Sequence, residues 1–158
     1  MVREFREHWK NYVLQSALGL VVVFILLWWL RAENLLIVAS LGSTAFIVFA
    51  MPKSLTAQPR NVIGGQISGL GCGALAALLV SMLAEQSPSG QAALYSLAVG
   101  LSIFIMVVSD TEHPPASGTA LGIAIRGVSI KATIAVVVGA VLLSLVHQLV
   151  RHKLRDLA

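Results

Sequence analysis

The sequence has little charge. Asp, Glu, Lys and Arg make up 11% of its 158 residues, whereas a soluble domain carries about 25%. So few charges could not cover the surface of a water-soluble globule of this size. The hydrophobic fraction is 57% and the mean hydropathy is +0.86. Composition therefore excludes a disordered chain, an ordinary soluble domain and a nucleic-acid-binding protein, and it predicts an integral membrane protein.

Cysteine is almost absent as well. Cys72 is the only one, so an internal disulfide is excluded, and its place in an apolar, glycine-rich run is typical of a small packing residue. The segment 110–113 offers Asp, Glu and His side chains, but no second His or Cys cluster completes a metal site. No Walker or dinucleotide-binding glycine pattern is present. We therefore expect no metal, no organic cofactor and no enzymatic activity.

Six apolar runs organise the chain, with a tight break at 31–34 and a turn at 85–91 among the polar segments that separate them. The runs cover residues 13–30, 35–51, 62–84, 92–109, 116–125 and 132–150. The first is long enough to span ~27 Å as a helix, whereas the fifth reaches only ~15 Å, about half of a hydrocarbon core. The fifth run therefore either crosses as a short helix or is re-entrant.

This pattern predicts an all-α membrane protein formed by one transmembrane domain over residues 1–158. Residues 1–12 mix acids with bases and are either a short interfacial helix before a retained anchor or a frayed terminus. Residues 13–150 form the membrane region, and 151–158 form a basic tail.

Basic residues set the expected orientation. Eight of them fall near the N-terminus, in the 52–61 loop and at the C-terminus: Arg3, Arg6, Lys10, Lys53, Arg60, Arg151, Lys153 and Arg155. If all six runs cross, these regions share one side, and only Arg31, Arg126 and Lys131 lie on the other. We therefore expect a multi-pass protein of the inner (plasma) membrane with both termini in the cytoplasm, and five crossings fit less well.

The second and fifth runs share small polar residues at their centres. These residues are Gly42, Ser43 and Thr44 in the second run and Ser117, Gly118 and Thr119 in the fifth. Each run is the middle member of a set of three, which predicts two inverted three-helix halves with broken or short middle helices. Transporters often place their sites where such helices meet, although small residues also recur by chance in membrane helices.

A stripe of small residues marks the third run. Gly65, Gly69 and Gly73 follow one another every four residues, a spacing that lets another helix backbone approach closely. The neighbour is either another subunit or, as we slightly favour, a helix of the same chain. We also expect a homo-oligomer.

The densest polar segment, 110–115, ends in a proline pair. Pro114 and Pro115 cannot lie inside a helix but fit its first turn, so a helix is predicted to start here. Its first amide groups lack helical partners and would attract an anion, with hydroxyl donors from Ser117 and Thr119. In the alternative, the Asp110, Thr111 or His113 side chain caps the helix and the segment is only structural.

Arg60 and Asn61 form a second polar centre, at the start of the third run. A cation at a helix start is disfavoured by the macrodipole, so Arg60 needs a partner or a purpose. Three interpretations stay open: contact with lipid headgroups, pairing with Glu112 or Asp110, or attraction of anions into an entrance.

Residues 58–65, with the sequence QPRNVIGG, and residues 112–121, with EHPPA followed by TAL, resemble the HPP family of integral membrane proteins. The family is named for its His-Pro-Pro triplet, and the resemblance extends over about residues 9–150. It implies transport of nitrite, with nitrate second, because plant and cyanobacterial members are associated with nitrite transport. Some members carry C-terminal CBS modules, which we do not expect in this protein. Ser117-Gly118 replaces an expected Gly-Ala, and Gln66 replaces a common His.

We therefore expect a transporter or channel for a small inorganic anion, in contact with membrane lipid and not with nucleic acid. The candidate substrate-binding residues are Gly42, Ser43, Thr44, Arg60, Asn61, His113, Pro114, Pro115, Ser117, Gly118 and Thr119. Moving one negative charge inward against 100 mV costs about 2.3 kcal/mol, so uptake needs an accompanying proton. His113, with Glu112 and Asp110, is the candidate proton-linked group. The main alternative is a non-transporting membrane scaffold or assembly protein, whose main feature would be the glycine stripe.

Overall fold

The computed structural model describes residues 2–30, 35–83 and 87–157, and within them all regular structure is helical. The elements are α1 (Val2–Leu30), α2 (Leu35–Ala50), the 3-10 turn η1 (Leu55–Ala57), α3 (Pro59–Met82), α4 (Pro88–Val108), α5 (Pro115–Arg126), α6 (Ile130–Val150) and the 3-10 turn η2 (Arg151–Lys153). The expected all-α membrane fold is confirmed. The predicted break at 31–34 and part of the turn at 85–91 lie outside the described residues.

Four helices are long and apolar enough to cross a membrane. The candidate spans are Arg6–Trp28, Pro59–Met82, Pro88–Val108 and Ile130–Lys153, the last of which includes η2. The 16 residues of α2 and the 12 residues of α5 correspond to about 24 and about 18 Å. The proline pair begins α5, and Gly127, with a φ of 81°, follows its last residue. The prediction that His-Pro-Pro precedes a short helix is therefore confirmed.

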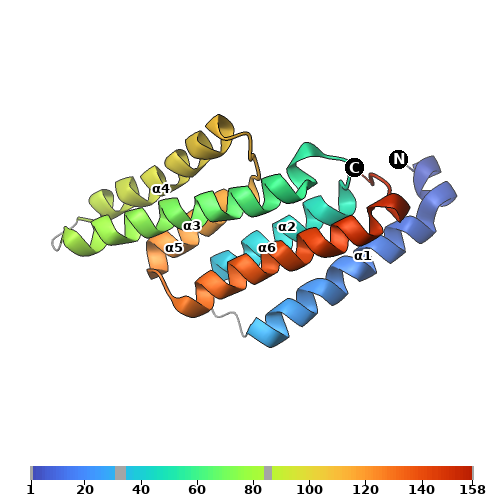
Figure 1. The fold of residues 1–158 in the computed structure, drawn as a ribbon, viewed down its shortest axis with the longest axis horizontal. Coiled ribbons are helices and arrows are strands. Elements are labelled where there is room, and N and C mark those ends of the chain that lie inside the picture. Colours follow the sequence, from blue (N-terminus) through green and yellow to red (C-terminus); the bar gives the residue numbers. More distant parts are fainter. Residues whose placement is uncertain (1, 31–34, 84–86, 158) are drawn as a thin grey trace.

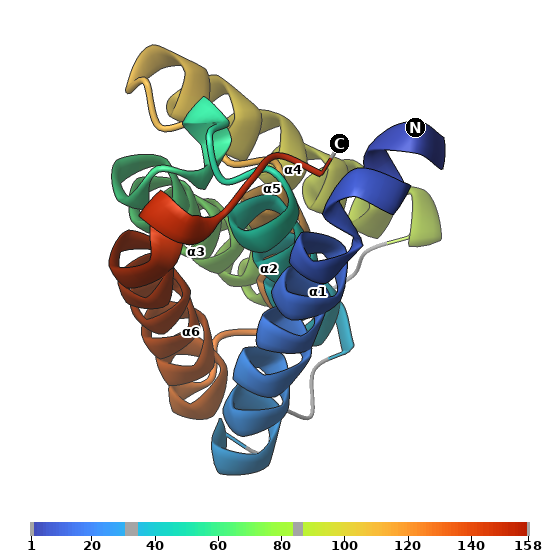
Figure 2. The same cartoon turned by 90° about the vertical axis from the view of Figure 1, so that its right-hand side faces the viewer.

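The six helices run roughly side by side, with α5 enclosed by others. Figure 1 shows both termini and the connection between α2 and α3 at one end of the molecule. The second view shows α1 and α6 on the outside and α2 between them and the other helices (Figure 2). Helix α5 packs against α2, α3 and α4, so its short length is covered on three sides by longer neighbours.

The glycine stripe of α3 is the surface that receives α5. A Cβ atom at Gly69 would collide with the carbonyl oxygen of Ala116, and one at Gly73 would lie 2.6 Å from that of Ala120. At Gly65 it would lie 2.6 Å from the Cβ of His113. The neighbour is therefore a helix of the same chain, and this face is not available to another subunit.

Helix α2 decides between the two alternatives predicted for the middle helices, broken or short. It is continuous from Leu35 to Ala50 through Gly42, Ser43 and Thr44, so it is short and not broken. The Ser43 hydroxyl donates to the Ala39 carbonyl one turn back at 2.9 Å, and the Thr44 hydroxyl lies at the same distance from the Ser40 carbonyl. Because each hydroxyl has a carbonyl of its own helix within hydrogen-bond distance, these residues do not need to interrupt the helix. The two middle helices are short, and the inverted relation of the halves stays a prediction.

Hydrogen bonds join the C-terminal segment to α1 and α2. Helix α1 has a kink at His8, and its buried Gln15 donates to the Arg155 carbonyl at 2.9 Å and accepts from the Arg155 amide at 3.1 Å. The Leu157 amide donates to the Ala50 carbonyl at 2.8 Å. The predicted basic tail therefore lies against the middle of α1, at Gln15, and against the end of α2, at Ala50.

A pair of glycine substitutions tests the α3–α5 contact. Gly69→Ala should destabilise the protein by about 1–3 kcal/mol, because the new methyl group meets backbone that cannot move aside. Gly71→Ala, two residues away with nothing within 4 Å of the new atom, should be neutral or stabilise α3 by up to about 1 kcal/mol. Thermal unfolding in mild detergent, followed by circular dichroism, measures both. Equal melting temperatures for the two variants would contradict this packing.

Candidate functional site

Five polar side chains meet between α2, α3 and the start of α5, and we call them the buried polar cluster. They are Ser40 and Thr44 of α2, Gln66 of α3, His113 of the segment before α5, and Thr119 of α5. None of the five is more than 4% exposed. Burying this many polar groups is costly unless they are hydrogen-bonded to one another.

Ser40, Gln66 and Thr119 form one half of this cluster. The Ser40 hydroxyl lies 2.6 Å from the Pro115 carbonyl oxygen and 2.8 Å from the Thr119 hydroxyl. Thr119 donates to the Gln66 side-chain oxygen at 2.7 Å. The Gln66 amide nitrogen points toward Thr44, 3.2 Å away. Hydrogen bonds of these side chains thus join the three helices.

His113 forms the other half. Its Nδ1 lies 2.9 Å from the Thr56 carbonyl oxygen, and its Nε2 lies 2.9 Å from the Thr44 hydroxyl. A carbonyl only accepts, so Nδ1 carries a hydrogen. His113 lies in the connection before α5, outside the four long spans, and burial lowers its pKa to about 4 against a smaller opposing effect of the bond to Thr56.

The first turn of α5 does not offer the free amides expected from the sequence. Pro114 and Pro115 have no N–H group, the Ala116 amide donates to the His113 carbonyl at 2.9 Å, and the Ser117 amide donates to the Pro114 carbonyl at 3.2 Å. The His113 side chain does not cap this turn either, since its nitrogens face Thr44 and Thr56. A ligand at this end of α5 would therefore meet side-chain groups, not backbone amides.

Ser117 and Thr119 lie on different sides of α5. Ser117 accepts a hydrogen bond from Ser102 of α4 at 3.2 Å, whereas Thr119 joins the buried polar cluster. Residues two apart on a helix point in nearly opposite directions. The expectation that both hydroxyls serve one ligand is therefore not met by the geometry.

An open groove runs between α2 and the first half of α5, and we call it the α2/α5 groove. It has a volume of about 510 Å³ and is lined by Leu36, Ala39, Ser40, Ser43, Phe46, Ile47, Pro114, Pro115 and Gly118. Ser40 belongs both to this groove and to the buried polar cluster. Gly42 lies elsewhere, in a groove between α1 and α2.

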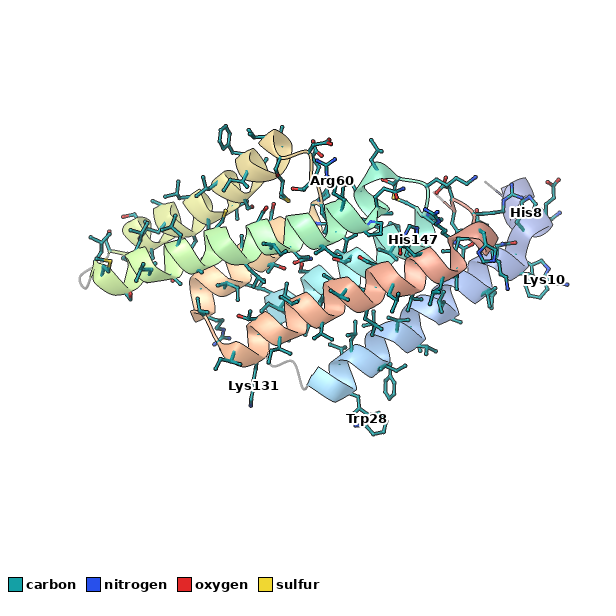
Figure 3. The ribbon with its side chains drawn as sticks, in the orientation of Figure 1. His8, Lys10, Trp28, Arg60, Lys131 and His147 are labelled. Carbon is teal, nitrogen blue, oxygen red and sulfur yellow. The ribbon has the colours of Figure 1, made fainter. Side chains whose placement is uncertain are left out.

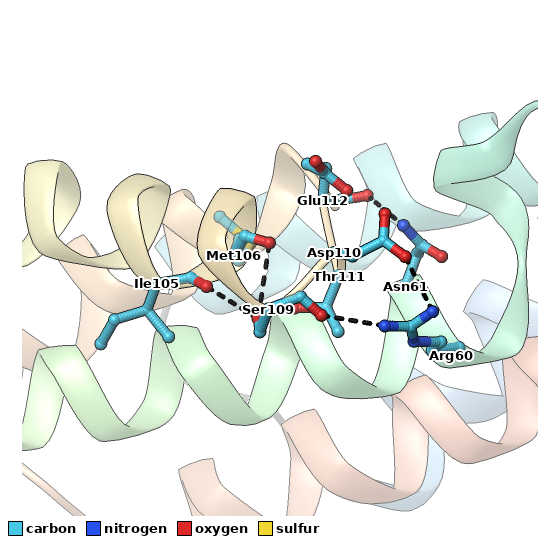
Figure 4. A network of polar contacts seen from close by, with 8 residues as sticks. All are labelled: Arg60, Asn61, Ile105, Met106, Ser109, Asp110, Thr111 and Glu112. Atoms are coloured by element: carbon cyan, nitrogen blue, oxygen red, sulfur yellow. Dashed lines mark hydrogen bonds and ion pairs between the residues drawn. The ribbon is translucent and has the colours of Figure 1, made fainter.

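Arg60 and Asn61 hold the connection between α4 and α5 against the start of α3 (Figure 4). Arg60 forms an ion pair with Asp110 at 2.8 Å and donates to the Ser109 carbonyl at 3.0 Å. Asn61 donates to the Glu112 carbonyl at 3.2 Å. Of the two partners left open for Arg60, the structure shows Asp110. Both charged side chains are mostly exposed, so this pair contributes little to stability.

Ser40 was not among the residues predicted for the site, and Gln66 was noted only as a departure from the family pattern. Two signals could have found them. Ser40 and Thr44 are four apart and so share a face of one helix, and Gln66 is an amide inside an otherwise apolar span, where polar residues are expensive. Among the described residues, no three His, Cys, Asp or Glu side chains are grouped as metal ligands.

Comparison with known proteins places this site in a family context. The family pattern described as HPP, transmembrane region, matches residues 3–155. Two Dictyostelium discoideum proteins, each named only as a transmembrane protein, are 35% identical over 99 residues and 31% identical over 110 residues. The matches cover 63% and 68% of this chain but 33% and 34% of those proteins, so the chain spans about a third of their length. No solved structure matches.

The lowered pKa of His113 predicts how stability depends on pH. Between pH 6.5 and about 4, the unfolded chain takes up a proton on this residue before the folded protein does. The folded state should therefore lose up to about 3 kcal/mol of stability as the pH falls through this window. His113→Gln should lack this part of the loss, while the other histidines contribute equally in both proteins. Melting temperatures in detergent at pH 7 and pH 4.5 measure it, and the same loss in both proteins would contradict the prediction.

Proposed function

Since the chain belongs to the HPP transmembrane family, we propose that it transports a small inorganic anion across its membrane, with nitrite as the first candidate. The observation that carries the proposal is the buried polar cluster beside the open α2/α5 groove. Polar groups buried among membrane helices are expensive, and an ionisable one such as His113 is a candidate for a substrate or proton pathway. Ser40 belongs to both features, so an ion in the groove can reach the cluster.

The chemistry of the lining suits an anion better than a cation. The groove is lined by apolar side chains and the hydroxyls of Ser40 and Ser43, and the cluster adds hydroxyl, amide and imidazole groups. Hydroxyl and amide groups and a protonated imidazole each donate hydrogen bonds. No carboxylate takes part in either, so no fixed negative charge opposes an anion. Nitrite is small and accepts hydrogen bonds at both oxygens, which matches closely spaced hydroxyl groups.

The charge at one end of the protein favours the proposed orientation. Figure 3 shows Arg60, His8 and Lys10 toward the end that holds both termini, and Lys131 toward the other. The positive-inside rule then puts both termini in the cytoplasm, with the inner (plasma) membrane as the proposed location. Arg60 lies where it can attract an anion toward the groove, although Asp110 offsets part of its charge.

A proton on His113 is the proposed countercharge. A transported anion beside the ring favours the imidazolium form through charge attraction, and the pair then crosses with no net charge. His113→Gln should keep the fold and abolish the acceleration of nitrite uptake by an inward proton gradient. Proteoliposomes loaded at two internal pH values measure this effect. A well-folded variant that keeps the wild-type response would show that His113 carries no proton.

Filling the groove should slow transport. Gly118 lines the groove, and a Cβ there would make only an ordinary contact with Ser40, 3.7 Å away, so Gly118→Val should fold while its methyl groups occupy the groove. We expect nitrite uptake into proteoliposomes to fall at least about tenfold, that is by ~1.4 kcal/mol in the barrier. Gly100→Val, with open space around it on α4, is the control. Equal uptake by both variants would contradict this route.

A non-transporting membrane scaffold is the alternative. It predicts that wild-type protein moves neither nitrite nor nitrate faster than liposomes without protein, because the buried polar cluster would then serve only to join the helices.

A further inference from the structure

The hydrogen atoms of the buried polar cluster do not suffice for its polar contacts. Seven donor–acceptor pairs connect Ser40, Thr44, Gln66, Thr119, the His113 ring and the carbonyls of Ser40 and Pro115. With His113 neutral, the three hydroxyls supply one hydrogen each and the Gln66 amide supplies two. Five hydrogens therefore serve seven pairs, and one added proton would complete a further pair.

Thr44 has too few hydrogens for its contacts, and one of these contacts is with His113. Its single hydroxyl hydrogen lies between two acceptors, the Ser40 carbonyl at 2.9 Å and His113 Nε2 at 2.9 Å. When His113 is neutral, Thr44 donates to Nε2. When His113 is charged, Nε2 donates to Thr44, and the Thr44 hydrogen turns back to the Ser40 carbonyl. Both states are satisfied, and no heavy atom has to move between them.

From this geometry we infer that Thr44 is the positioning residue that lets His113 gain and lose its proton during transport, by turning its hydroxyl from donor to acceptor. The inference rests on the proposed anion transport and deepens it. The proton comes from water on the side from which the anion enters, forms the Nε2–H bond, and returns to water on the other side when that bond breaks. One positive and one negative charge then cross together.

The surroundings of His113 leave this role to Thr44. The groups that contact it from α2, α3 and the 51–58 connection do not titrate: Thr44, Gly65 and Thr56. The next groups from α2, α3 and the end of α4, which contact Thr44 or lie beside Gly65, do not titrate either: Ser40, Gln66 and Met106. The charged groups of its own connection are Asp110, which pairs with Arg60, and Glu112, which contributes its backbone carbonyl to Asn61. His147 of α6 reaches the same 51–58 connection at the Pro52 carbonyl, 3.0 Å away. Within the described residues, no hydrogen bond joins Glu112 to His113.

The first test measures the proton directly and does not depend on transport. Protein with ¹⁵N-labelled histidine is titrated in detergent, with and without sodium nitrite, and the His113 signal is identified by its loss in His113→Gln. Thr44→Val keeps the side-chain shape but removes the acceptor, so the His113 pKa should fall by about one to two units. Thr44→Ser should restore it. Unchanged titration in Thr44→Val would overturn the inference whether or not the protein moves nitrite.

The second test measures coupling. In proteoliposomes, Thr44→Val should lose at least about nine-tenths of the acceleration of nitrite uptake by an inward proton gradient, a tenfold effect of ~1.4 kcal/mol. Thr44→Ser should keep most of it. Ser68→Ala, which removes a hydroxyl bonded only within α3, is the control. Wild-type coupling in Thr44→Val would overturn the inference, whereas absence of uptake in the wild type would overturn the proposed function and leave the titration to decide the role of Thr44.

Discussion

The close approach of α3 and α5 is the constraint on which the rest of the structure depends. No side chain separates the two helices at Gly65, Gly69 and Gly73, so the α5 backbone lies directly on α3. This contact places Thr119 within 2.7 Å of Gln66 and holds His113 beside the first turns of α3. Larger side chains in place of these glycines would separate the groups of the buried polar cluster, and each group would then be left without its hydrogen-bond partner.

The short length of α5 gives this contact a functional consequence. A helix that began in water would have a solvated first turn. Helix α5 instead begins among its neighbours, and its first amides donate hydrogen bonds to the carbonyls of His113 and Pro114. The polar groups that remain there are side chains. These side chains pack against α3 on one side, and on the other side Ser40 lines the α2/α5 groove. Transport of an anion past side chains whose hydrogens can be redistributed is the account that connects these features.

Much of this architecture follows from local chemistry in the sequence. A proline pair fixes a helix start, glycines every four residues fix a close contact, and apolar length fixes the spans. The sequence could not show which face of α5 meets which neighbour, so Ser117 was grouped with Thr119 although it faces Ser102. It could not show that Ser43 and Thr44 bond within α2, and it gave no sign of the contact between Gln15 and Arg155. These features depend on the tertiary arrangement of helices and on distant partners.

The central claim is that an anion crosses together with one proton. Simultaneous recording of nitrite uptake and internal pH in proteoliposomes, with the membrane potential clamped at several values, tests it most directly. Liposomes without protein report the nitrous acid that crosses lipid unaided. The account predicts protein-dependent uptake that acidifies the interior by one proton per nitrite and whose rate does not change with the clamped potential. Protein-dependent uptake that follows the potential and leaves the internal pH unchanged would contradict it.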